Sequence, residues 1–227
     1  MKKTTIIKWT ALNVLSFVAA VLFLLTGCVS MSTMQTARTT EKGDIAGGGG
    51  IGLAGYDNGA VDTAGNSMGS ISVPFIELYG RYGITDHLDI GAKLTIIGTF
   101  LVDGKYQLLG DAQSKTALSA GFGFGFLTMK SENYINKIRD IHIPIYASYH
   151  PAEWFALYIN PRYVMRMNNS TNYGKKDNYT SNWWGATGGI RLGKKNALFA
   201  EYSYFYNSYV PNTPLTQATV GFGIGIK

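Results

Sequence analysis

Residues 117–128 have the sequence ALSAGFGFGFLT, in which large apolar side chains alternate with small or polar ones. Phe122, Phe124 and Phe126 share one face of an extended chain, and the glycines between them share the other. A period of two residues predicts a β-strand with one strongly apolar face. That face has to lie against lipid or against a hydrophobic core.

The same alternation recurs along the chain from Asp44 to Lys227 and predicts about ten strands. We expect them at residues 44–56, 72–84, 87–100, 104–110, 116–129, 140–150, 154–167, 182–192, 197–207 and 217–227. In several strands the second face carries charge instead of glycine. The charged residues that we assign to this face are Glu77, Arg81, Lys93, Arg162, Arg166, Arg191 and Glu201.

The connections between these strands alternate in character. Short turns are expected at residues 84–87, 111–115, 151–153 and 193–196, and longer polar loops at 57–71, 130–139, 168–181 and 208–216. The short connection near Asp103 and Gly104 is the exception. Short turns at one end and long loops at the other are typical of up-and-down barrels in the bacterial outer membrane. An even strand count places both ends of the barrel on the short-turn side.

Alternation alone does not separate a membrane barrel from a soluble β-sandwich, because each has one apolar face. The composition favours the membrane: 46% of the residues are hydrophobic and only 15% are charged, well below the quarter that is usual for a soluble domain. Aromatic residues, 13% of the chain, gather near the expected strand ends, as in membrane-interface belts. We therefore predict an all-β, antiparallel, up-and-down transmembrane barrel of about ten strands.

The N-terminus has the features of a secretory signal. Lys2 and Lys3 open a positive region, an apolar run from Trp9 to Leu25 follows, and small residues lead to Cys28. We expect a helical signal peptide at residues 1–27. The alternative is an uncleaved membrane anchor, since residues 6–25 are just long enough to span a bilayer.

The sequence LTGC at residues 25–28 resembles the lipobox of bacterial lipoproteins. The resemblance implies that Cys28 is acylated and becomes the first residue of the mature chain, and that Val29 is compatible with export to the outer membrane. Residues 28–43 are rich in Ser, Thr and Met without an apolar period, and predict a flexible tether ahead of a barrel at 44–227. This tether would begin beside the inner leaflet, on the short-turn side.

Two further stretches resemble small, lipid-anchored outer-membrane barrel proteins of largely uncharacterised function. One is the lead-in at residues 35–43. The other is the C-terminal pattern of Thr219, Gly221, Ile224 and Ile226, which resembles the signal read by the barrel-insertion machinery but ends on Ile226-Lys227 without the usual aromatic. The resemblance implies outer-membrane lipid, lipoprotein-processing enzymes and the barrel-insertion machinery as partners. It names no surface ligand. The polar composition of residues 168–181 at the long-loop end predicts that the outer loops are exposed on the cell surface.

Other function classes receive little support. Without Lys2, Lys3 and Lys8 of the signal peptide the net charge falls from +6 to +3, too modest to indicate nucleic-acid binding. The three histidines lack metal-ligand spacing, no cofactor is indicated, and the glycine motif at residues 50–55 lacks the strand–helix context of a dinucleotide site. Asp140 and His142 share a strand face near an outer loop, where some barrel enzymes carry catalytic groups, but no specific motif accompanies them.

The charged inner face is the most informative functional feature. Charges beside lipid are costly, so these residues should face the lumen. A narrow barrel is filled by its own side chains, which predicts a lumen closed by ion pairs such as Glu77 with Arg81 and Glu201 with Arg191. We therefore expect a structural or surface-interaction role and no enzymatic activity. The alternatives are a narrow anion-favouring channel lined by arginines and a rim-located protease or lipid-modifying enzyme.

Overall fold

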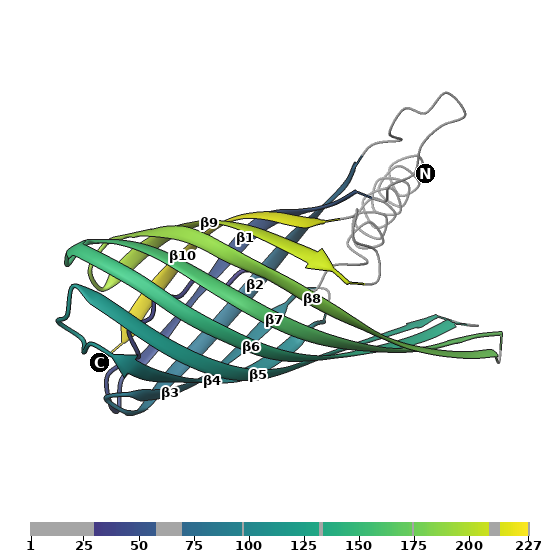
Figure 1. Ribbon diagram of the computed structural model, residues 1–227, viewed down its shortest axis with the longest axis horizontal. Coiled ribbons are helices and arrows are strands. Elements are labelled where there is room, and N and C mark those ends of the chain that lie inside the picture. Colours follow the sequence, from purple (N-terminus) through teal and green to yellow (C-terminus); the bar gives the residue numbers. More distant parts are fainter. Residues whose placement is uncertain are drawn as a thin grey trace, which may run out of the picture.

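The computed structural model describes residues 30–57, 70–96, 98–131, 134–173, 175–208 and 214–226, and within them it forms one closed antiparallel barrel (Figure 1). The ten strands are β1 (Ile45–Asp57), β2 (Ser70–Thr85), β3 (Leu88–Thr95), β4 (Phe100–Leu109), β5 (Thr116–Ser131), β6 (Tyr134–Ala152), β7 (Phe155–Asn172), β8 (Lys175–Leu192), β9 (Asn196–Asn207) and β10 (Leu215–Ile226). The predicted fold class is confirmed. The described residues contain no helix that is long and apolar enough to cross a membrane. The signal peptide and Cys28 lie outside these residues.

Every strand pairs with its neighbours in sequence, and β1 closes the barrel against β10. In that closing pair Ile45 lies opposite Ile226 and Tyr56 lies opposite Leu215. The N-terminal end of β1, the C-terminal end of β10 and the four short turns therefore share one end of the barrel. We call it the short-turn end, and the opposite end the long-loop end.

The barrel is apolar outside and polar inside, the reverse of a soluble protein. Phe122 and Phe126 are 59% and 45% exposed on the outer wall, as are large apolar residues of all the other strands. Charged and amide side chains such as Glu77, Lys105 and Gln217 are buried in the lumen, with exposures of 0%, 2% and 1%. Such an arrangement is stable only where the outer wall meets hydrocarbon instead of water.

The outward apolar residues form a belt of the height that a membrane requires. On β9 they run from Leu198 to Tyr206, eight residue steps apart. At about 3.3 Å per residue and a tilt of about 40°, these steps rise about 20 Å along the barrel axis. A transmembrane barrel carries an apolar band of about 25 Å, so the belt matches a bilayer core.

Three predicted boundaries are wrong. The β3–β4 connection lies at residues 96–99, so Asp103 stands within β4 and not in a loop. The expected loops 130–139 and 168–181 are largely strand, because β5–β6 and β7–β8 continue as long hairpins beyond the rest of the barrel wall (Figure 1). These stretches are polar on both faces and so lack the apolar alternation that marks the membrane-embedded part. They pair residue by residue all the same, as in Asn169 opposite Asn178.

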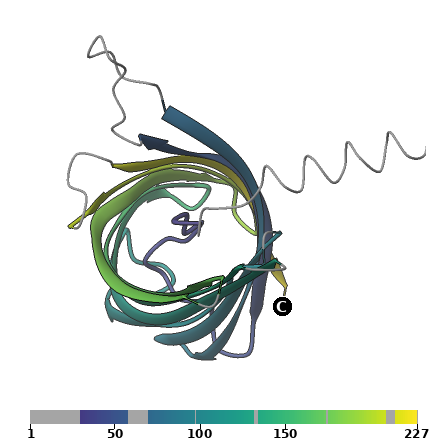
Figure 2. The ribbon, with the colours of Figure 1, turned by 90° about the vertical axis from the view of Figure 1, so that its right-hand side faces the viewer.

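The largest departure from the prediction concerns residues 30–43, which the sequence identified as a flexible tether. Residues 30–40 of this stretch lie inside the barrel and pass along its lumen, as the end-on view in Figure 2 shows, and residues 41–43 are exposed. Met31, Met34 and Ala37 are at most 1% exposed. We refer to residues 30–43 as the plug segment.

Candidate functional site: the plugged lumen

The plug segment runs in a defined direction. Gly43 donates its N–H to the Gly83 carbonyl at the short-turn end, and the Thr40 N–H donates to Asp89 Oδ2 (2.8 Å), near the start of β3. Ser30 and Met31 lie instead against Gln217, the third residue of β10 from the long-loop end. The segment therefore descends through the lumen toward the short turns and then reverses into β1.

Glu201 on β9 anchors the middle of the plug segment. Its carboxylate accepts the N–H of Thr33 (2.9 Å) and of Met34 (2.6 Å), and the Thr33 hydroxyl (2.6 Å). Tyr158 donates a fourth hydrogen bond from its hydroxyl (2.9 Å). A buried carboxylate normally requires a cation, whereas this one is satisfied by four hydrogen-bond donors, three of them from the plug segment.

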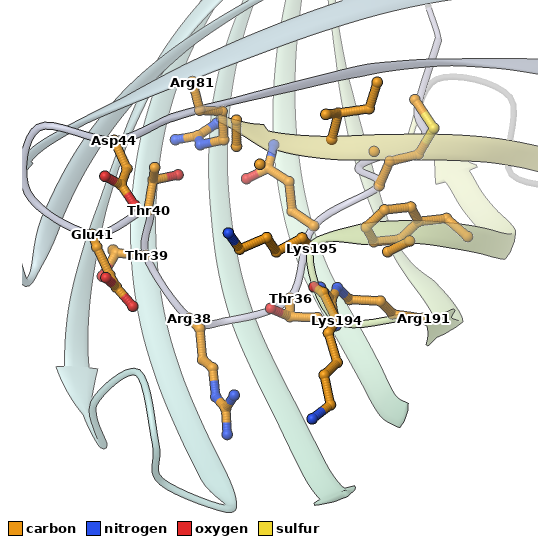
Figure 3. A pocket seen from close by; sticks show the side chains of 18 of the residues that line it. Thr36, Arg38, Thr39, Thr40, Glu41, Asp44, Arg81, Arg191, Lys194 and Lys195 are labelled. Carbon is orange, nitrogen blue, oxygen red and sulfur yellow. The ribbon is translucent and has the colours of Figure 1, made fainter. Parts of the chain in front are cut away.

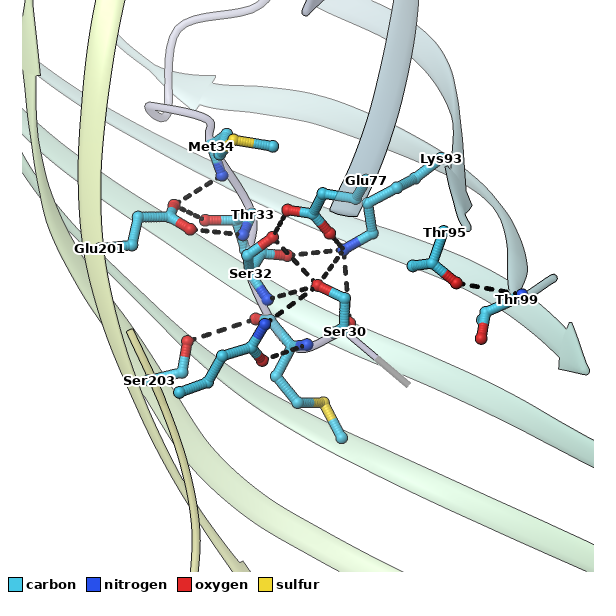
Figure 4. A network of polar contacts seen from close by, with 12 residues as sticks. Ser30, Ser32, Thr33, Met34, Glu77, Lys93, Thr95, Thr99, Glu201 and Ser203 are labelled. Carbon is cyan, nitrogen blue, oxygen red and sulfur yellow. Dashed lines mark hydrogen bonds and ion pairs between the residues drawn. The ribbon is translucent and has the colours of Figure 1, made fainter. Parts of the chain in front are cut away.

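A second anchor surrounds Ser30 and Ser32 (Figure 4). Ser32 donates its hydroxyl to Glu77 Oε1, and Lys93 Nζ lies 3.4 Å from Glu77 Oε2. The same ammonium donates to the carbonyls of Ser32 (2.8 Å) and Ser30 (3.3 Å). Glu77 and Lys93 thus pair with each other and also bind the plug segment, through the Ser32 hydroxyl and the carbonyls of Ser30 and Ser32.

Polar side chains of the wall satisfy most of the remaining backbone of the plug segment. Met31 is held on both sides: its N–H donates to Gln217 Oε1 (2.7 Å), and its carbonyl accepts from Arg162 and from Thr187 (3.0 Å). Further down, the carbonyls of Thr36 and Arg38 accept from Lys105 Nζ at 3.1 and 2.9 Å. A buried extended segment needs partners for its backbone groups, and here the lumen supplies them.

Glycines on the closing strands give the plug segment its space. A Cβ on Gly50 of β1 would lie 2.8 Å from the Met34 sulfur and 3.1 Å from the Val220 carbonyl oxygen. Both distances are below ordinary van der Waals contact. Gly50 therefore serves a packing requirement of the plug segment.

All seven charged residues singled out from the sequence lie on the inner side of the wall, but their pairing differs from the prediction. Glu77 pairs with Lys93, and Arg81 pairs with Asp89 and Asp103 on the next two strands (2.8 Å to Asp103). Arg166 forms a two-point ion pair with Asp140, at 2.9 and 2.8 Å. No Glu77–Arg81 or Glu201–Arg191 ion pair occurs among the described residues.

Four further charged residues of the lumen take part in these ion pairs and were not predicted to do so: Asp89, Asp103, Lys105 and Asp140. Asp89 and Lys93 stand on the same face of one strand, so the alternation was sufficient to include Asp89. Asp103 and Lys105 were missed because the β3–β4 turn was placed too late in the chain.

A cavity of about 350 Å³ remains between the plug segment and the wall at the short-turn end (Figure 3). Met34 and Phe199 line its inner part, and Arg38, Arg191 and Lys195 its mouth. Arg191 donates to the carbonyl oxygens of Gly193 (2.6 Å) and Lys194 and has no carboxylate partner among the described residues. At the rim Lys194 Nζ lies 2.6 Å from Glu153, and this hydrogen bond and charge lower the pKa of that exposed carboxyl.

Asp140 and His142 both face the lumen, at 1% and 2% exposure, with His142 Nε2 3.9 Å from Asp140 Oδ2. Both carboxylate oxygens of Asp140 accept from Arg166, and neither ring nitrogen of His142 has a hydrogen-bond partner in the described part of the chain. Asp140 is therefore hydrogen-bonded through Arg166 and not through His142. Nor do the described residues hold a cluster of three or more potential metal ligands.

No protein-family model matches the chain, and no curated protein matches it as a relative. Among solved structures, the attachment invasion locus protein Ail of Yersinia pestis is 10% identical with a TM-score of 0.41, covering 82% of this chain and 99% of that chain. The outer membrane protease OmpT from Escherichia coli is 12% identical with a TM-score of 0.46, covering 86% and 99%. An outer membrane channel from Pseudomonas putida F1 is 10% identical with a TM-score of 0.46, covering 87% and 100%. At these identities the likeness concerns the fold alone.

Proposed function

We propose that this chain is a bacterial outer-membrane β-barrel lipoprotein with a closed lumen and a structural or surface-interaction role. The observation that carries the proposal is the plug segment, which occupies the lumen through hydrogen bonds to buried wall residues from Glu77 to Gln217. A lumen held shut in this way serves poorly as a passage. The outward apolar belt supports the membrane location, and the lipobox at Cys28 supports the anchor.

The surface-interaction role rests on the two long hairpins. The ends of β5–β6 and β7–β8 leave the apolar belt and expose polar side chains on both faces, among them Lys137, Lys175 and Lys176. Fully paired strands form a rigid projection, so it can present these side chains without an ordering cost on binding. We assign no enzymatic activity to the barrel.

Single-channel recording in planar lipid bilayers tests the closed lumen. The purified full-length protein is expected to give no steady conductance, and a variant lacking residues 30–38 is expected to conduct once it has folded. A difference in gel mobility between unheated and heated samples is the control for folding of both forms. Steady, anion-selective current through the unmodified protein would replace the proposal by the channel alternative.

That alternative has one observation in its favour, the cation-rich mouth of the cavity at the short-turn end. Arg191 belongs to the wall and has no carboxylate partner among the described residues, so this mouth would favour anions once the plug segment, which carries Arg38, moved. The same recordings distinguish the two roles: a gated channel should open spontaneously without deletion of the plug segment, and a permanently closed barrel should not.

A further inference from the structure

The direction of the plug segment determines the end of the barrel at which the chain before it leaves. Met31 and Ser30 lie against Gln217, and Thr33 lies against Glu201. In the closing sheet Gln217 pairs with Ala54, only three residues before the end of β1 at Asp57. Ser30 is therefore deep in the long-loop half of the lumen.

Chain length excludes a return to the short-turn end. From Gln217 to Ile226 the strand takes nine steps, which is about 23 Å along the axis at about 3.3 Å per residue and a tilt of about 40°. From Ser30 back to Cys28 the chain has two residues, which span at most about 7 Å. A residue so close to Ser30 cannot lie beside the short turns.

The barrel wall next to Ser30 extends less far toward the long-loop end than the wall formed by β6 and β7. Above Gln217, β10 has only Thr216 and Leu215, whereas β6 and β7 continue into the projecting hairpins (Figure 1). The outward residues at this height are Leu53 and Tyr204, 56% and 37% exposed, at the upper part of the apolar belt. Two further residues span at most about 7 Å, which is enough to reach the level at which this belt ends.

We propose that the mature N-terminus leaves the barrel through the long-loop mouth, so that an acyl group on Cys28 lies in the outward-facing leaflet of the membrane. The tether predicted from the sequence would have placed it in the opposite leaflet. The position of the acyl group rests on the proposed lipid anchor, whereas the exit direction rests on the plug segment alone. The barrel would then be fixed to the same leaflet that surrounds its projecting hairpins, with its own N-terminal chain passed through its lumen.

Thiol labelling of whole cells tests the exit direction. Cys28 itself is blocked if it is acylated, so a cysteine is placed next to it by Val29→Cys. Two matched controls carry Lys176→Cys, at the tip of the β7–β8 hairpin, and Lys195→Cys, in a short turn; both lysines are exposed. A membrane-impermeant maleimide is applied to intact cells and to permeabilised cells.

The expected result is that V29C and K176C react on intact cells, while K195C reacts only after permeabilisation. If V29C, like K195C, reacted only after permeabilisation, the proposed exit through the long-loop mouth would be overturned. Labelling of K195C on intact cells, with K176C protected, would mean that the barrel is inverted, which would overturn the proposed surface role instead.

A second variant keeps the test decisive if V29C is processed poorly. A protease recognition sequence inserted between Val29 and Ser30 should be cut by protease added to intact cells, and cutting only after permeabilisation would contradict the proposal. Mass spectrometry of the N-terminal peptide is read separately. An unmodified Cys28 would remove the lipid anchor and leave the exit direction standing.

Discussion

Replacement of Glu201 by alanine is expected to loosen the plug segment. The change removes the acceptor of four hydrogen bonds, and it leaves the N–H groups of Thr33 and Met34 without their partner in a buried site. Each buried donor left unsatisfied costs about 1–3 kcal/mol, so the two backbone groups alone cost about 2–6 kcal/mol. A loss of about 3 kcal/mol raises the population with an undocked plug segment by a factor of about 150.

Two measurements follow that population. In planar bilayers E201A should show brief current bursts that the unmodified protein lacks, and limited proteolysis in detergent should cut the plug segment far faster. Glu201→Gln retains one carbonyl oxygen but turns a donor toward Thr33, so an intermediate effect is expected. Glu153→Ala is the matched control, because its ion pair with Lys194 is fully exposed and contributes little to stability. If E201A behaved as E153A does in both assays, the plug segment would not depend on this carboxylate.

Three further outcomes are expected. Mass spectrometry of the mature protein should find an acylated Cys28 at the N-terminus, and a mature chain beginning at Met1 would contradict the lipoprotein assignment. Gly50→Ala should increase proteolysis of the plug segment, since its Cβ would meet Met34 at 2.8 Å, whereas Gly80→Ala, with nothing within 4 Å, should be silent; equal effects would refute the packing role of β1. In the turn at residues 111–114, hydrogen bonds from the Ser114 hydroxyl and the Gln113 and Ser114 N–H groups lower the pKa of Asp111, so the turn should keep its full stability above pH ~4 and lose it as the pH falls through the lowered pKa. Amide hydrogen exchange at Gln113 and Ser114 should accelerate over that range, and a flat profile would refute the contribution of the carboxylate.

The barrel was predictable because its signal is local. Alternation of side chains across one strand is a property of neighbouring residues, so the strand count and the inward charges follow from the sequence. Ion pairs depend instead on the register between strands, which the sequence does not display. Glu77 and Arg81 stand four residues apart on one strand, about 13 Å, whereas Asp103 lies across from Arg81 through Gly91 of β3.

The plug segment was missed for a different reason. Serine, threonine and methionine without a period are typical of a linker, and nothing local distinguishes an exposed linker from one whose backbone is satisfied by distant side chains. A signal was present elsewhere: besides its charges, the inner face carries neutral polar residues at Gln107, Asn160, Thr187 and Gln217. Their amide and hydroxyl groups can bind the backbone of a segment within the lumen, as Gln217 and Thr187 do with Met31.

The glycines of β1 affect both the pairing of the strands and the docking of the plug segment. Glycine weakens a strand, because it loses more conformational entropy on folding and offers no side chain for packing, so a run of glycines is a poor choice for the strand that closes a barrel. Here Gly50 of β1 and Gly221 of β10 lie where the plug segment turns its Met34 toward the β1–β10 seam. The stability lost in the strand is offset by contacts that exist only when the plug segment is docked, such as those of Glu201 with Thr33 and Met34. Docking of the plug segment should therefore add to the stability of the closed β1–β10 pair.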